Sequence, residues 1–334
     1  MMTSQLARPA LRSASKAASS VLAGPSLRAF STSALRQKEV ENVTVFGGGL
    51  MGSGIAQVLA HEGNYNVTLA DVTEDALVKG KSIMQKSLTR IAKKKMADQS
   101  AEAQEQFVKS IVDKVQTTTD AAQAVKSSDL VIEAIIENIK IKQDLFKFLD
   151  SKAPDSCIFT TNTSSLSVKD VAQSSNRPDR FGGFHAFNPV PQMKLVEIIK
   201  TDQTSEETFE TLMNVARKMK KQPVACTDAP GFIVNRLLVP YLLEAIRLVE
   251  RGEATAEDVD IAMKLGAGHP MGPIQLADFV GLDTLSHISK GWRESRVSTG
   301  EISADIVQES KLLEDLVAQG RTGKKSDKGG FYPA

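Results

Sequence analysis

Two polar residues, His185 and Glu197, stand in apolar segments that are predicted to be neighbouring strands. His185 lies within residues 181–187 and Glu197 within residues 195–199, and a short connection that starts with Asn188 joins the two segments. Because a buried carboxylate without a partner is strongly unfavourable, we expect Glu197 to lie beside His185. A carboxylate in this position fixes the imidazole tautomer and raises its basicity, which suits a general base. Either residue alone could be an ordinary core residue, and as a pair we interpret them as catalytic.

A glycine-rich turn near residue 50 has the spacing of a dinucleotide-binding loop. Gly47, Gly49 and Gly52 follow the apolar run 43–46 and precede a predicted helix. Glycine at these positions permits the tight turn, the approach of backbone N–H groups to a pyrophosphate, and close packing of helix against strand. Asp71, nineteen positions after Gly52 at the end of a second predicted strand, can accept hydrogen bonds from both ribose hydroxyls and repel the 2′-phosphate of NADP. We therefore expect NAD as cofactor, the alternative being a glycine-rich turn in another kind of α/β protein.

Polar residues also follow two further predicted strands at their carboxyl ends, where open parallel sheets bind ligands. Glu137 is either a site acid or a cap for the next helix. Ser164 belongs to the polar cluster 162–165, whose hydroxyls cap a helix or reach a substrate oxygen. Asn235 lies near the start of a helix predicted over 232–251, and it is either a packing amide or a donor to a substrate carbonyl.

A predicted pair of helices, residues 75–96 and 101–112, is inserted into the nucleotide-binding segment. The first helix has an apolar stripe on one side. Its outward face carries a series of cations, which are Lys79, Lys81, Lys86, Arg90, Lys93, Lys94 and Lys95. Such a face is either merely solvated or a landing surface for a phosphorylated substrate, because ammonium groups hold phosphates well.

The turn sequence Asp228-Ala229-Pro230-Gly231 predicts a domain boundary. Strands and helices alternate before it, so we expect an α/β domain over 38–227: a Rossmann-type dinucleotide-binding domain with the inserted helical pair. Only helices are predicted after it, so we expect an all-α C-terminal domain over 228–334.

Composition excludes several classes of protein. The formal net charge of +1 gives no reason to expect a nucleic acid partner. The longest apolar helix contains Asn235, Arg236, Glu244 and Arg247, so no integral membrane span is expected. No group of His, Cys or acidic residues has the spacing of metal ligands, so we expect no metal.

The first 38 residues differ in composition from the rest of the chain. They hold basic residues and many Ser and Ala, and no acidic residue occurs before Glu39. This composition is typical of a mitochondrial transit peptide, and residues 28–33 resemble a matrix-processing site. We therefore expect a transit peptide over residues 1–37 and a location in the mitochondrial matrix, the alternative being a disordered basic arm.

The chain after this leader resembles the 3-hydroxyacyl-CoA dehydrogenase family over essentially its whole length. The segments that carry the resemblance occur in the order GGGLMGSGIAQ, IEAIIEN, TNTSSL, HAFNPVPQMKLVEII, DAPGFIVNRLLVPYL, KLGAGHPMGP and GLDT. The resemblance implies oxidation of L-3-hydroxyacyl-CoA to 3-oxoacyl-CoA with NAD in fatty-acid β-oxidation. It also implies an acyl-CoA thioester bound between the two domains and a homodimer formed through the C-terminal domain.

The resemblance further implies a role for each residue that matches a family motif. His185 would be the catalytic base and Glu197 its partner, with Asn235 and Ser164 in contact with the substrate near the reacting carbon. The residues that would hold the CoA portion are Ser87 and Lys94, and those that would surround NAD are Gly47, Gly48, Gly49, Leu50, Met51, Gly52, Asp71, Glu137, Lys142, Asn188 and the tail residue Lys325.

Several departures from the family pattern accompany this interpretation, among them an extra residue in Asn64-Tyr65-Asn66 and His269 in place of an aromatic residue, and two rival functions remain. Ala186 stands where an aromatic residue is commoner, a loss of bulk that we associate with acyl-chain preference, and Asp327 interrupts the tail pattern around Lys325. A dehydrogenase selective for 3-hydroxybutyryl-CoA would carry the same motifs. A non-catalytic, crystallin-like NAD-binding homologue is the rival of another class, and the intact His185 and Glu197 argue against it.

Overall fold

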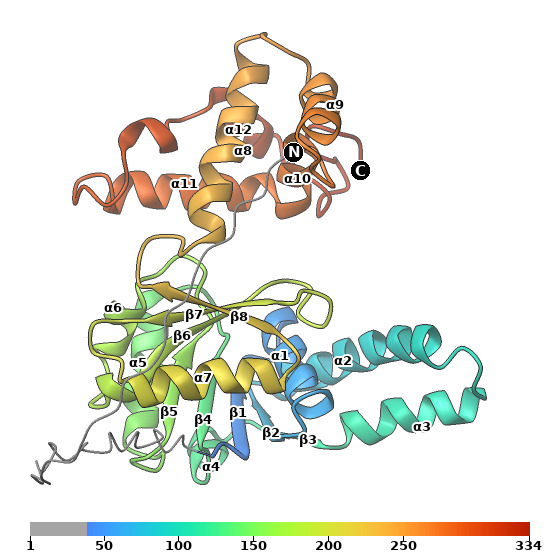
Figure 1. Ribbon diagram of the computed structural model, residues 1–334, viewed down its shortest axis with the longest axis vertical. Helices are drawn as coiled ribbons and strands as arrows, with labels where there is room; N and C mark the ends of the chain where they lie inside the picture. The colour runs from blue at the N-terminus through green and yellow to red at the C-terminus, as the bar shows by residue number, and fades with distance from the viewer. Residues whose placement is uncertain (1–38) are drawn as a thin grey trace, which may run out of the picture. The chain divides into compact units, whose positions relative to one another are not determined.

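A computed structural model describes residues 39–334 of the chain (Figure 1). The predicted transit peptide, residues 1–37, lies outside the described residues.

The strands of residues 39–334 form one eight-stranded sheet in the order β3-β2-β1-β4-β5-β6-β7-β8. The strands are β1 (Asn42–Phe46), β2 (Asn66–Ala70), β3 (Val115–Thr118), β4 (Leu130–Glu133), β5 (Ile158–Thr161), β6 (Phe181–Ala186), β7 (Leu195–Lys200) and β8 (Gln222–Thr227). All neighbouring strands are parallel except β6 and β7, which pair antiparallel. The chain order reverses between β1 and β4, and ligands bind at such a switch point in open α/β sheets. The predicted Rossmann-type fold is confirmed.

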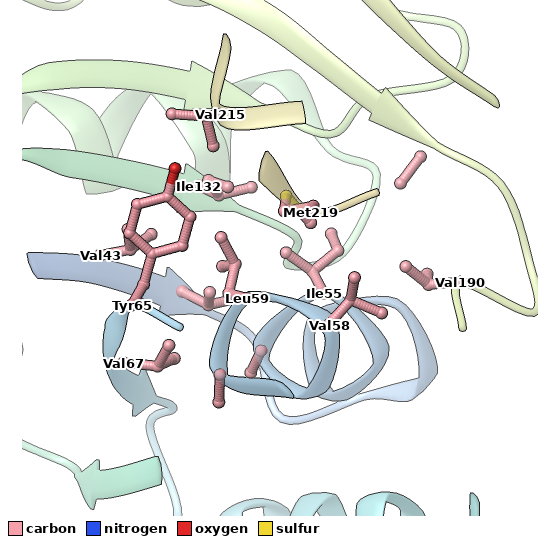
Figure 2. Packing of buried hydrophobic residues seen from close by; sticks show 14 of the residues in the cluster. Val43, Ile55, Val58, Leu59, Tyr65, Val67, Ile132, Val190, Val215 and Met219 are labelled. Atoms are coloured by element: carbon pink, nitrogen blue, oxygen red, sulfur yellow. The ribbon is translucent and has the colours of Figure 1, made fainter. Parts of the chain in front are cut away.

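Helices cover both faces of this sheet, and each face has its own apolar core. One core joins the sheet to α1 (Leu50–His61), α2 (Glu74–Lys95), α3 (Ala101–Val112) and α7 (Glu206–Lys218). The other joins it to α4 (Ala121–Val125), α5 (Ile139–Asp150) and α6 (Val168–Ala172), and the short 3₁₀ turn Pro178–Arg180 leads into β6. Figure 2 shows the first core, in which Ile55, Val58 and Leu59 of α1 pack among side chains of the sheet and of α7.

The inserted helical pair, α2 and α3, lies beyond the β3 edge of the sheet (Figure 1). Thr73 and Ser100 cap the N-termini of α2 and α3, since each side chain accepts a backbone N–H of the first turn. Leu77, Met84 and Leu88 of α2 are buried, so the apolar stripe faces the core and the cationic face is left outward.

Residues 234–318 are helical, as predicted, and have an apolar core of their own. The helices are α8 (Val234–Glu250), α9 (Ala256–Gly266), α10 (Pro273–Val280), α11 (Leu282–Ser295) and α12 (Lys311–Ala318), with a 3₁₀ turn at Ala304–Val307. Buried Asp260 and Asp278 hold this part together: Asp260 accepts the first-turn N–H groups of α10, and Asp278 accepts the N–H groups of Phe331 and Tyr332 in the tail.

Candidate active site

The glycine loop between β1 and α1 has the close backbone approaches that its sequence predicts. Gly47 has φ +111°, and a Cβ at Gly52 would lie 1.9 Å from the carbonyl oxygen of Gly47, so neither position accepts a side chain without strain. At Gly49, by contrast, the space where a Cβ would stand is open. Helix α1 begins after Gly49 without a side-chain cap, so its first-turn N–H groups remain available to an anion such as a phosphate.

A cavity of about 430 Å³ opens beside this loop at the carboxyl ends of β1, β2 and β4. Its wall is largely apolar and includes Phe46, Ala134, Ile135 and Ile141, with the carboxylate of Asp71 at its edge. Asp71 accepts hydrogen bonds from the N–H groups of Gly48 (2.6 Å) and Val72 (2.7 Å), which fixes its side chain next to the loop. An apolar slot, an acid and a free helix N-terminus fit the adenine, the ribose and the pyrophosphate of NAD.

His185 and Glu197 face each other across the antiparallel pair β6 and β7, where they are register partners. Glu197 Oε2 lies 2.7 Å from His185 Nδ1, and both side chains are almost completely buried. The ring of His185 also packs on Phe187 and Phe232, at centroid distances of 4.4 and 5.5 Å. The two strand sequences predict this contact, and the structure brings the two side chains together.

The second oxygen of Glu197 binds the start of α8. Oε1 accepts the N–H groups of Ile233 (3.1 Å) and Val234 (2.9 Å), so one carboxylate holds both the imidazole and the helix that carries Asn235. Burial acts to raise the pKa of Glu197, but the hydrogen bonds from His185 and from these two N–H groups outweigh it and hold that pKa below its ordinary value. Glu197 is therefore a carboxylate near neutral pH.

Ser164 and Glu137 meet at the ends of β4 and β5. Glu137 Oε1 accepts the hydroxyl of Thr163 (2.5 Å), the N–H of Ser164 (3.0 Å) and both donors of Ser165. The carbonyl oxygen of Ser164 in turn accepts the side-chain amide of Asn235 at 3.3 Å. Glu137, residues 163–165 and Asn235, which come from three distant parts of the sequence, thus form one polar cluster, and we call residues 162–165 the serine turn.

Lys142 completes this cluster from inside the protein. The Lys142 side chain is fully buried, and its ammonium lies 3.2 Å from Glu137 Oε2 and 2.6 Å from Glu133 Oε1. Burial acts to raise the pKa of Glu137, but the Lys142 charge and the hydrogen bonds of Thr163 and Ser164 outweigh it, so the pKa of Glu137 lies below its ordinary value. The helix cap that we considered for Glu137 is made by Asn138 instead, whose side chain accepts the N–H of Ile141. Glu133 is not among the predicted site residues, although its position as an acid inside an apolar strand is a visible signal in the sequence.

The remaining predicted residues occupy less connected positions. Asn188 is exposed after β6 and forms a cis peptide bond with Pro189. Ser87 and Lys94 are two turns apart on α2 and so project from the same face of that helix, with Lys94 exposed. Lys325 lies in the tail, with its ammonium 3.4 Å from the hydroxyl of Thr284. Nothing in the structure tests the roles predicted for these four.

Residues 39–334 contain neither a metal-ligand group nor a membrane-spanning helix. No group of three or more His, Cys, Asp or Glu side chains is arranged to hold a metal ion there. In the same part of the chain no helix is both long and apolar enough to cross a membrane.

Comparison with known proteins agrees with this geometry. Residues 42–229 match the family model described as the 3-hydroxyacyl-CoA dehydrogenase NAD binding domain, and residues 231–333 match the C-terminal domain of the same family.

Individual relatives cover most of the chain. It is 53% identical to human mitochondrial hydroxyacyl-coenzyme A dehydrogenase over 88% of this chain and 91% of the relative. It is 40% identical to 3-hydroxybutyryl-CoA dehydrogenase of Clostridioides difficile over 87% of this chain and 98% of the relative. The crystal structure of M. tuberculosis FadB2 superposes with a TM-score of 0.80 at 38% identity, covering 89% of this chain and 100% of that one. The chain belongs to the 3-hydroxyacyl-CoA dehydrogenase family.

Proposed function

We propose that His185 is the base with which this NAD-dependent dehydrogenase oxidises the 3-hydroxyl group of an L-3-hydroxyacyl-CoA. Membership of the family makes the chain an enzyme of fatty-acid oxidation with NAD as cofactor. The observation that carries the proposal is the 2.7 Å contact between His185 Nδ1 and Glu197 Oε2.

The hydrogen bond to Glu197 determines which ring nitrogen does the chemistry. Because Glu197 is a carboxylate, Nδ1 carries the proton and donates it, which leaves the lone pair of Nε2 to accept the proton of the 3-hydroxyl group. The proton becomes part of an imidazolium, and the adjacent carboxylate stabilises that charge. NAD, when bound, supplies the acceptor for the hydride that leaves carbon 3.

Asn235 and Ser164 position the substrate in this proposal. Glu197 holds the start of α8 and Glu137 holds the serine turn, so both side chains stand on a fixed backbone. Their amide and hydroxyl groups supply hydrogen bonds to the oxygen atoms of the acyl group, which aligns carbon 3 with His185.

The cofactor and CoA assignments rest on the family resemblance, and the glycine loop, Asp71 and the cationic face of α2 support them. The set Gly47, Gly48, Gly49, Leu50, Met51, Gly52, Asp71, Glu137, Lys142, Asn188 and Lys325 surrounds NAD in this proposal, with Lys325 contributed by the tail. Ser87 and Lys94 hold the phosphates of the CoA portion, since both project from one face of a cationic helix.

The domain and assembly assignments are likewise proposals. We assign residues 38–227 to the NAD-binding domain and 228–334 to a helical domain that forms a homodimer. Large apolar side chains stand exposed on the helical part, namely Leu237, Ile261, Leu265 and Phe279, and a partner surface would cover them. A molar mass twice that of the chain in sedimentation would support the dimer, and a monomer at micromolar concentration would exclude it.

The kinship with mitochondrial enzymes suggests a mitochondrial protein. We propose the matrix as its location, with residues 1–37 as the transit peptide, because the leader composition is that of matrix proteins. A selective 3-hydroxybutyryl-CoA dehydrogenase is the second candidate function, which the 40% identity to an enzyme of that name supports.

A single assay separates these functions. NADH oxidation is followed by absorbance with 3-oxoacyl-CoA thioesters of four, eight and twelve carbons. Turnover of the whole series supports the general dehydrogenase, and turnover of the four-carbon thioester alone supports the selective one. Absence of turnover with all three thioesters would refute both.

A further inference from the structure

Glu133 is a buried carboxylate that the catalytic proposal does not use. It is the last residue of β4, where it pairs in register with Phe46 of β1 and with Thr161 of β5. Phe46 leads directly into the glycine loop, and Thr161 leads directly into the serine turn. Glu133 therefore lies at the switch point of the sheet, between the predicted cofactor side and the predicted substrate side.

Each contact of Glu133 reaches a different part of the site. Oε1 accepts the N–H of Ile135 at 2.7 Å, and Ile135 belongs to the wall of the 430 Å³ cavity. The same oxygen binds the Lys142 ammonium at 2.6 Å. Oε2 accepts the hydroxyl of Thr161 at 2.6 Å. The carboxylate is 0% exposed, so these partners replace water completely.

Lys142 links Glu133 to the serine turn through Glu137. Its ammonium is also 0% exposed and stands between Glu133 and Glu137, and Glu137 accepts the N–H groups of Ser164 and Ser165. Two carboxylates share one ammonium here, and the excess negative charge lies between the fully buried Glu133 and Glu137, whose side chain is 33% exposed. Such a charge is tolerated only with well-placed hydrogen-bond donors, which here are the hydroxyls and N–H groups of the loops themselves.

We propose that Glu133 is a positioning residue that couples the dinucleotide pocket to the serine turn. It holds the pocket wall through Ile135 and orients Lys142 and Glu137, so that cofactor affinity depends on a side chain that does not touch the cofactor. The inference rests on the proposed function, because Lys142 and Glu137 are assigned to the NAD site there. A purely structural role would stabilise the fold without any selective effect on NADH.

The chain offers a matched pair of substitutions to test this coupling. Thr161→Val removes the hydroxyl that donates to Glu133, while Thr160→Val, one position earlier in the same strand, removes an equally buried hydroxyl that donates to Val131. Both substitutions delete one buried donor at constant shape, and only the first touches Glu133. Thr161→Ser keeps the hydroxyl and serves as the rescue.

The dissociation constant of NADH is measured for each variant by fluorescence titration without acyl-CoA, together with the KM for acetoacetyl-CoA and the thermal midpoint. We expect Thr161→Val to weaken NADH binding by about fivefold relative to Thr160→Val, the scale of coupling through one residue. Thr161→Ser restores the affinity. The KM for acetoacetyl-CoA also rises, because Ser164 lies in the coupled serine turn, but by less than the NADH affinity falls, because Ser87 and Lys94, which hold the CoA portion in the proposed function, are untouched. Glu133→Gln, if it folds, weakens NADH binding further.

Equal NADH affinities of Thr161→Val and Thr160→Val would overturn the inference, as would an equal loss of NADH and acyl-CoA affinity in Thr161→Val. The titration needs no turnover. A wild-type protein that binds NADH but reduces no 3-oxoacyl-CoA would therefore refute the proposed function. The NADH affinities of Thr161→Val and Thr160→Val could still be compared in that case.

Discussion

Two buried carboxylates of the same sheet, Glu197 and Glu133, are held in different ways. Both side chains are 0% exposed. Glu197 in β7 shares its oxygens between an imidazole and the N–H groups at the start of α8. Glu133 in β4 shares its oxygens among an ammonium, a hydroxyl and one N–H group.

The nature of the partner determines what each carboxylate can do. A neutral imidazole has one nitrogen that donates and one that accepts, so the partner of Glu197 can take up a proton during turnover. The ammonium of Lys142 donates hydrogen bonds and has no acceptor, so the partner of Glu133 fixes a geometry and cannot take a proton from a substrate. Burial of an acid thus serves proton transfer in one region and positioning in the other.

We expect the largest effect when the imidazole of His185 is removed. In His185→Gln the proton acceptor is lost, and we expect kcat to fall about 10³- to 10⁴-fold, near the upper range for general acid–base catalysis. The affinity for NADH stays within about twofold, since His185 has no part in the glycine loop. Stopped-flow turnover and NADH titration measure the two. The matched control is His287→Gln on an exposed position of α11, and full activity of His185→Gln would refute the assignment.

Removing the ammonium of Lys142 should lower the free energy of unfolding more than it lowers the rate of catalysis. Lys142→Met leaves Glu133 and Glu137 without their shared cation, and we expect a loss of about 3–5 kcal/mol in the free energy of unfolding, as for other broken buried ion pairs. Lys140→Met removes the exposed partner of Asp144 on the same helix, and it should cost less than about 1 kcal/mol. Urea titration compares the two. A similar small loss in both variants would show that the buried group does not stabilise the fold.

Glu197→Gln should have an intermediate effect, and on catalysis. The amide keeps the shape but cannot stabilise the imidazolium as a charge does, so we expect kcat to fall about 100-fold. Its single carbonyl oxygen can serve either His185 or the start of α8, and a modest loss of thermal stability follows. Steady-state kinetics beside Glu206→Gln, a change in an exposed acid, provides the comparison. Unchanged kcat in Glu197→Gln would mean that the pair is structural.

Helices with a strong hydrophobic periodicity were predicted with nearly correct bounds, whereas the end of one strand was predicted wrongly. The helix predicted over 101–112 has those bounds as α3, and the one predicted over 75–96 is α2 shifted by one residue. The strand predicted over 130–136 was wrong at its end, because β4 stops at Glu133. The physical reason is local: the carboxylate of Glu133 takes the N–H of Ile135, and the backbone turns away from the ladder.

The contact in the site was predictable where two neighbouring strands each held one polar residue. Glu197 stood out because the preceding strand offered His185, whereas the partner of Glu133 lies in α5, where a lysine looks like part of the polar face. The periodicity did contain the signal, since Lys142 is four positions before Phe146 and seven before Leu149, on the buried stripe. Ala186 shows the reverse case. Its side chain is buried in the core of α1 and α7, away from the His185 face, so its small size affects packing and gives no support to an altered acyl-chain preference.

The smallest effect is a difference in acid sensitivity, and it separates the two regions without disturbing catalysis at neutral pH. The pKa values of Glu137 and Glu197 are both held below the ordinary value of 4.5. A depressed pKa means that each carboxylate contributes stability that is fully present above about 4.5 and is lost as the pH falls below it, towards the folded-state value. The thermal midpoint of the wild type should therefore drop steeply below pH 4.5.

Glu137→Gln removes one of these two contributions, so its thermal midpoint should be lower than that of the wild type at pH 7 and should fall less between pH 5 and pH 3.5. Glu206→Gln, measured in parallel, should follow the wild-type curve. If Glu137→Gln lost as much stability as the wild type over this interval, the acid sensitivity would belong to other carboxylates whose pKa is lowered, such as Glu197, Glu62 and Asp150. Glu137 would then have the same pKa in the unfolded chain as in the fold. Its ion pair with Lys142 would fix the geometry of the serine turn without adding electrostatic stability to the fold.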